Sequence, residues 1–156
     1  MELLSAAGIF FLSAIPFLEA RYTIPVAILQ GFSPSEAFLL GVAGNLLPVL
    51  PLLLFLDPVS RFLSDRSATF SRFFLWLFAR TRRHSERFER WGTLALLLFV
   101  AVPLPVTGAW SGCAAAFVFG IRVPHAFLAI AGGTVIAALL TTLPALGIFT
   151  FLGGSV

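Results

Sequence analysis

The chain has 156 residues, of which 59% are hydrophobic and 11% are charged, far below the roughly 25% charged residues of soluble domains. This composition excludes a soluble globular protein and predicts an integral membrane protein with a single membrane domain over residues 1–156. The net charge of +3 does not indicate a nucleic-acid partner, because eight of the ten basic residues cluster between Arg61 and Arg90.

The first apolar block, residues 1–56, is expected to form a broken hairpin followed by one membrane span. The apolar pieces 3–15 and 24–31 are short, whereas 37–56 has the roughly 20 residues needed to cross a bilayer core. Pro16 and Pro25 remove backbone donors and favour extended geometry before them, so we expect them to break this hairpin. Four simple spans without re-entrance are the alternative.

The polar middle, residues 57–91, is predicted to be a cytoplasmic linker that contains an amphipathic helix at the membrane surface. Its position follows from the positive-inside rule, because it carries eight arginines against four acidic residues. Such a helix contacts membrane lipids and serves either as a topology anchor or to recruit anionic lipid. The predicted apolar face has Phe70, Phe73, Phe74, Leu77, Phe78, Phe88 and Trp91, and the basic face has Arg72, Arg80, Arg83, Arg87 and Arg90.

The second apolar block, residues 92–156, is expected to repeat the first. Pro103, Pro105 and Gly108 break it between the apolar pieces 94–102 and 109–120, and a full span follows at 126–149. Shifting the chain by 89 positions aligns Pro16 with Pro105, Ala20 with Ala109, Ala27 with Ala116, Gly31 with Gly120, residues 37–39 with 126–128, and Gly44 with Gly133. We therefore expect an all-α integral membrane protein of two inverted repeats, each a re-entrant helical hairpin followed by a transmembrane helix, joined by the amphipathic interfacial helix.

Glu19 and Arg21 are two opposite charges within residues 3–32, which are otherwise uncharged. An ionisable group at this depth costs at least about 2.5 to 3.5 kcal/mol, so it is usually paired, solvated or functional. On an extended segment, residues two apart point to the same side, so both side chains would face one cavity. Either Arg21 binds a phosphate or other anion while Glu19 carries a proton, or the two form a structural ion pair.

Four uncharged polar residues are further candidates for substrate binding. Thr107, Trp110 and Ser111 surround the break of the second hairpin, and Asn45 lies in the first span. Each also has a structural interpretation. Asn45 could join two helices by a hydrogen bond, and the Gly-x-x-x-Gly spacing at Gly108 is typical of close helix packing.

Three stretches resemble the small multidrug export protein family, a distant relative of the DedA membrane proteins. They are "PFLEARYTIPVAI", "GVAGNLLPVLPLLLFLDPV" and "RWGTLALLLFVAVPLPVTGAWSGCAAA". The resemblance implies a multi-pass transporter with paired re-entrant hairpins in the cell membrane, expected to be a prokaryotic inner membrane. The DedA relationship implies lipid carriers such as undecaprenyl phosphate as a second substrate class, and proton coupling. Ala27 stands where other members often have glycine.

Other classes of function find less support in the sequence. A single cysteine and two histidines argue against a zinc site, and no other cofactor is expected. The "AWSG" sequence with Ser111 and His125 lacks the first glycine of an intramembrane serine protease, so we predict no enzyme. A membrane-organising protein without transport stays an alternative. We also expect a homo-oligomer, first a dimer, because two complete spans offer little protein to cover two polar hairpin tips.

Overall fold

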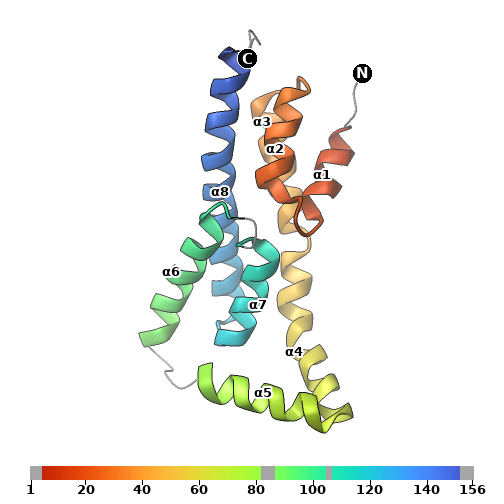
Figure 1. Ribbon diagram of the computed structural model, residues 1–156, viewed down its shortest axis with the longest axis vertical. Helices are drawn as coiled ribbons and strands as arrows, with labels where there is room; N and C mark the ends of the chain where they lie inside the picture. The colour runs from red at the N-terminus through yellow and green to blue at the C-terminus, as the bar shows by residue number, and fades with distance from the viewer. Residues whose placement is uncertain (1–4, 82–86, 105–106, 152–156) are drawn as a thin grey trace.

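The computed structural model describes residues 5–81, 87–104 and 107–151, and these fold into helices joined by short connections (Figure 1). The all-helical fold expected from the sequence is therefore confirmed. In chain order the helices are α1 (Ala6–Ala14), α2 (Glu19–Leu29), α3 (Pro34–Leu46), α4 (Val49–Arg66), α5 (Ala68–Thr81), α6 (Arg87–Ala101), α7 (Ala109–Phe119) and α8 (Val123–Phe151).

Two apolar stretches are long enough to cross a membrane. One runs along α3 and α4, from Pro34 to Arg66 through the short break at Leu47 and Pro48, and the other lies in α8 from Val123 to Ile148. Serine caps the first stretch, because the Ser33 hydroxyl accepts the backbone N–H of Glu36 and Pro34 occupies the first turn. With the apolar composition, these helices make the chain a membrane protein.

Two short hairpins precede these long helices. Residues 15–18 join α1 to α2, and residues 102–108 join α6 to α7. In Figure 1 the first connection and the described residues of the second, 102–104 and 107–108, lie at mid-height. Helix α1 packs on α3 and α6 packs on α8, while α2 also contacts α8 and α7 contacts α4. Each hairpin is thus held against both long apolar stretches.

The breaks coincide only in part with the predicted ones. Pro16 lies in the first connection, Pro103 lies in the second, and Gly108 directly precedes α7. The prediction that Pro25 breaks the first hairpin is wrong, because Pro25 lies inside α2. Proline inside a helix loses one backbone hydrogen bond, and packing of α2 against α3 and α8 holds the helix together there. Pro105 lies outside the described residues.

The structure divides the predicted amphipathic helix, whose two faces run from Phe70 to Trp91, between α5 and α6. Helix α4 continues to Arg66, the backbone becomes extended at Ser67, and α6 already begins at Arg87. Of the three helices α4, α5 and α6, α5 is the one that lies across the lower end of the molecule in Figure 1. Phe74 and Phe78 of α5 contact the Phe117 ring of α7, with ring centres 6.3 and 5.5 Å away. The side chains of Arg80, Arg83, Arg87, Phe88 and Arg90 lie outside the described residues.

Corresponding features of the two halves recur at the separation of 89 residues found in the sequence. Helix α3 begins at Pro34 and α8 at Val123. Gly31 and Gly120, with φ of 95° and 69°, follow α2 and α7 in the left-handed conformation that glycine adopts most readily. Gly44 and Gly133 bring α3 and α8 against the backbone carbonyls of Phe10 in α1 and Leu97 in α6.

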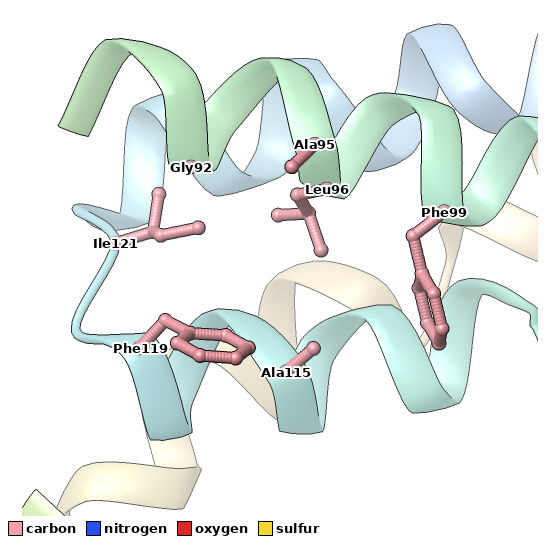
Figure 2. Close-up of a pocket in the computed structure, with 7 residues that line it drawn as sticks. All are labelled: Gly92, Ala95, Leu96, Phe99, Ala115, Phe119 and Ile121. Atoms are coloured by element: carbon pink, nitrogen blue, oxygen red, sulfur yellow. The ribbon is translucent and has the colours of Figure 1, made fainter. Parts of the chain in front are cut away.

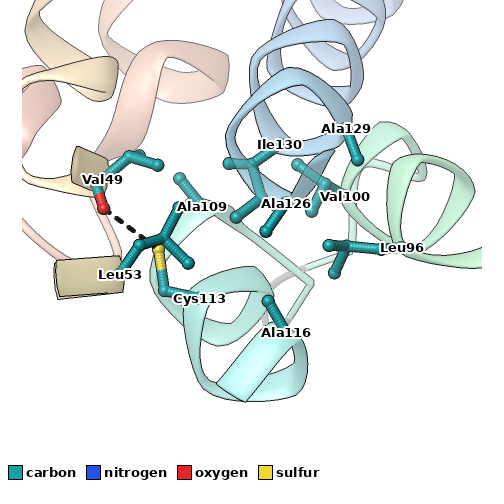
Figure 3. Packing of buried hydrophobic residues seen from close by; sticks show 10 residues of the cluster. All are labelled: Val49, Leu53, Leu96, Val100, Ala109, Cys113, Ala116, Ala126, Ala129 and Ile130. Carbon is teal, nitrogen blue, oxygen red and sulfur yellow. Dashed lines mark hydrogen bonds between the residues drawn. The ribbon is translucent and has the colours of Figure 1, made fainter. Parts of the chain in front are cut away.

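The buried apolar side chains form two clusters, one for each hairpin. The first joins α1, α2 and α3 with Ala138 of α8. The second joins α4, α6, α7 and α8, and in Figure 3 its side chains converge from these helices. Within it, the Cys113 thiol sulfur lies 3.8 Å from the backbone carbonyl oxygen of Val49. The second cluster comprises Val49, Leu53, Leu96, Val100, Ala109, Cys113, Ala116, Ala126, Ala129 and Ile130.

Candidate functional site

Glu19 and Arg21 both lie in the first turn of α2, not on an extended segment as expected. The residues before the helix turn sharply, and both Phe17 and Glu19 have positive φ, of 78° and 35°. Such backbone is unfavourable for residues other than glycine and is found most often at functional sites. The Glu19 and Arg21 side chains are 8% and 5% exposed, and their Oε2 and Nη2 atoms lie 3.1 Å apart. The predicted pairing of the two charges is present, reached by a different backbone path.

The carboxylate of Glu19 reaches the other hairpin at the start of α7. Its Oε1 accepts the backbone N–H of Ala109 at 3.1 Å. The N–H groups of a first helical turn lack partners within their own helix and favour a negative charge. Gly108 leaves the space for this approach, because a β-carbon there would overlap both carboxylate oxygens of Glu19.

The guanidinium of Arg21 reaches the connection that precedes α7. Its Nη1 donates to the backbone carbonyl of Leu104 at 2.7 Å, and its Nη2 donates to the carbonyl of Thr107. The planar guanidinium has five donors, so it can bind these two carbonyls and the carboxylate at once. Glu19 and Arg21 therefore join the two hairpins through a carboxylate, a guanidinium and backbone groups. We call this set of contacts the hairpin junction.

The three polar residues predicted in the second hairpin form hydrogen bonds with backbone groups of the two hairpins. The Thr107 hydroxyl donates to the carbonyl of Val102 at 2.6 Å, and the Ser111 hydroxyl accepts the N–H of Gly108 at 2.8 Å. Trp110 instead crosses to the first hairpin, where its indole Nε1–H donates to the carbonyl of Ala14 at 3.2 Å. The structure thus brings Thr107, Trp110 and Ser111 to the hairpin junction.

Asn45 is placed elsewhere, against the middle of α8. Its Nδ2 lies 3.5 Å from the Thr134 hydroxyl, both residues are buried, and its Oδ1 has no partner among the described residues. Sequence reasoning did not select Thr134, although the shift of 89 that revealed the repeat pairs these two positions. It also missed Ser13 of α1 and Thr23 of α2, two buried hydroxyl groups in mutual contact. Thr23 additionally donates to the carbonyl of Glu19.

A family model described as "Putative small multi-drug export protein" matches residues 19–140. The chain belongs to this family. No curated protein and no solved structure matches the chain. The match begins at Glu19 and includes Arg21, Asn45, Thr107, Trp110 and Ser111, so every residue predicted to bind the substrate lies in the matched part of this small multi-drug export protein.

The chemistry available to this small multi-drug export protein is that of one carboxylate and one guanidinium in a buried setting. The carboxylate can hold or release a proton, and the guanidinium can bind an anion once its present partners withdraw. Among the described residues, no group of three or more histidine, cysteine, aspartate or glutamate side chains is arranged to hold a metal ion. The family description suggests an export protein, not an enzyme.

Proposed function

We propose that this protein is a transporter in which the transported molecule binds at the hairpin junction and Glu19 exchanges a proton during the cycle. The observation that carries the proposal is the pair of buried charges in α2 that bind the backbone of the opposite hairpin. A structural ion pair is energetically expensive in an apolar interior, and apolar side chains of the same volume would often be as stable. Retaining two charges at the contact of two short hairpins therefore favours a role in transport.

The contacts suggest how a proton would open the junction. When Glu19 is ionised, its carboxylate is the anionic partner of both the Arg21 guanidinium and the start of α7. Protonation removes the negative charge, which weakens both contacts. Arg21 and the N–H groups of α7 can then bind an anionic group of the transported molecule, and the two hairpins can move apart.

We infer that the two halves are inverted repeats, with both ends of the described chain outside the cell and residues 57–91 in the cytoplasm. Reciprocal contacts support this. Arg21 of the first hairpin donates to the second connection, and Trp110, 89 positions later, donates to Ala14 at the end of α1, directly before the first connection. Asn45 and Thr134, also 89 positions apart, contact each other directly, as residues near a two-fold axis do. Inverted repeats with a midplane site are common in secondary transporters.

Two substrate classes follow from different observations. The family description points to small drug-like molecules. The Arg21 guanidinium instead favours a phosphate, such as that of a lipid carrier related to the undecaprenyl phosphate implied by the DedA resemblance. A phosphate would bind Arg21, whereas a cationic drug would instead pair with the ionised carboxylate of Glu19 in the same hairpin junction. A protein that only organises the membrane would carry neither.

Reconstitution of the purified protein into liposomes tests the proposal. One arm measures uptake of ethidium, a cationic dye, and the other measures transbilayer movement of a fluorescent polyprenyl phosphate, each with and without a pH gradient. We expect one arm to exceed protein-free liposomes and to respond to the gradient. Movement in neither arm would contradict transport of both proposed classes and favour the membrane-organising alternative.

A further inference from the structure

The outer side of the second hairpin contains an apolar groove between α6 and α7. The groove encloses about 240 Å³ and is distinct from the hairpin junction. Figure 2 shows Gly92, Ala95, Leu96 and Phe99 of α6 facing Ala115 and Phe119 of α7, with Ile121 at one end. We call it the α6–α7 groove.

The shape of the α6–α7 groove suits a linear hydrocarbon chain. Small residues on the two walls, Ala95 and Ala115, leave space between the helices at mid-length, and buried Leu96 forms the floor. The α6 positions extend from Gly92 to Phe99, about 10 Å at 1.5 Å per residue. The lining side chains are all hydrocarbon, so a polar ligand would find no side-chain hydrogen-bond partner there.

Charge at one end of the groove indicates which kind of lipid would bind. Ile121 is followed by Arg122, an exposed residue that lines a neighbouring cavity of about 290 Å³ with Asp57. The arginine-rich middle segment of the chain also precedes Gly92 directly in sequence. Basic residues beside an apolar surface attract anionic headgroups of the cytoplasmic leaflet.

We propose that the α6–α7 groove binds one acyl chain of an anionic phospholipid from the cytoplasmic leaflet, with the headgroup phosphate near Arg122. The apolar chain would cover the exposed surfaces of Ala95, Phe99 and Phe119, which the described protein leaves uncovered. This lipid is a bound partner and not the transported molecule. Whether the α6–α7 groove binds lipid is therefore a separate question from whether a molecule is transported through the hairpin junction.

Native mass spectrometry of the full protein, titrated with palmitoyl-oleoyl phosphatidylglycerol, tests the site. Phosphatidylcholine with the same chains is the uncharged-headgroup comparison. Ala115→Trp fills the groove, and Ala114→Trp places the same side chain one residue away at an exposed position outside it. Ala95→Trp fills the groove from the opposite, exposed wall and serves if Ala115→Trp lowers the folded yield.

We expect the native protein to retain one phosphatidylglycerol at least tenfold more tightly than phosphatidylcholine. Each groove-filling variant should weaken this binding about tenfold, Ala114→Trp should not, and Arg122→Gln should remove the preference for phosphatidylglycerol. Equal lipid binding by Ala114→Trp and the groove-filling variants would overturn the site. Unchanged preference in Arg122→Gln would overturn the headgroup assignment. Loss of oligomer without loss of lipid would show that a second copy occupies the groove instead.

Discussion

The carboxylate of Glu19 occupies the space that a β-carbon on residue 108 would need. Gly108 is therefore required by the neighbouring hairpin and not by its own backbone, whose extended φ of −130° any residue can adopt. The two positions differ by the same shift of 89 that relates the halves of the chain. The Glu19 carboxylate of the first hairpin thus fills the space that the absence of a side chain at Gly108 leaves in the second hairpin.

Gly108→Ala should disrupt the hairpin junction. The added methyl group displaces the Glu19 carboxylate from the Ala109 N–H, and overpacking of this kind costs about 1 to 3 kcal/mol. We expect a lower melting temperature in detergent and reduced transport. Gly147→Ala is the matched control, because a β-carbon there has no neighbour within 4 Å. A Gly108→Ala protein as stable and active as the control would contradict the close approach.

Replacing Arg21 should distinguish a structural ion pair from a transport site. Arg21→Met leaves Glu19 buried without its charged partner, and breaking a buried pair costs about 3 to 5 kcal/mol. Adding Glu19→Leu should recover much of the stability, because the double variant buries no charge. Arg61→Met, which breaks the exposed pair with Asp57, should cost about 0 to 1 kcal/mol.

Transport by these Arg21 variants gives the deciding readout. If the charges serve transport, the stabilised double variant stays inactive, whereas a purely structural pair predicts that activity returns with stability. Arg21→Lys keeps the charge but loses the planar fork that binds two carbonyls and the carboxylate. It should therefore weaken binding of the transported molecule even where the protein folds normally.

Part of this site was predictable from the sequence because charges are rare in apolar segments. That rule identified Glu19 and Arg21 and implied that they pair. It could not give the backbone path, since a proline such as Pro16 ends a helix while Pro25 is tolerated within one, depending on tertiary packing. The contact of Arg21 with the second connection also depends on how two distant hairpins meet, which local patterns do not contain.

The repeat carried more information than local patterns did. Positions 89 apart in an inverted repeat can meet at the axis, and this would have pointed from Asn45 to Thr134. The amphipathic helix was predicted too long because the spacing of Phe and Arg continues from α5 into α6. Periodicity reports which residues share a face, but it does not locate the end of α5 at Thr81.

Asn45 and Thr134 should cross-link when both are replaced by cysteine in a Cys113→Ala background. Their side chains are in contact between α3 and α8, so copper-phenanthroline or a short bifunctional thiol reagent should join them within one chain. Leu47→Cys with Thr134→Cys is the control, because Leu47 is exposed and lies two residues further along. Cross-linking of the control pair alone would contradict the arrangement of the two long apolar stretches.

The protein should form a homodimer in membranes. Large side chains on several helices remain exposed in the single chain, including Leu39 of α3 and Leu128 of α8 at 68% and 67%. Lipid can cover such surfaces, but a second copy would also shield the two short hairpins. Light scattering in mild detergent should give twice the protomer mass of 16.8 kDa, and a monomer at all concentrations would contradict this prediction.

The most direct test of the account is pH-gradient-driven uptake by Glu19→Gln in liposomes, measured with whichever substrate the native protein carries. The amide keeps the size of the side chain but removes the proton exchange, so gradient-driven uptake should fall to the protein-free level while substrate exchange persists. Glu36→Gln, at an exposed acidic residue in the first turn of α3, should transport like the native protein. Gradient-driven uptake at the native rate in Glu19→Gln would contradict the central claim that Glu19 couples proton movement to transport.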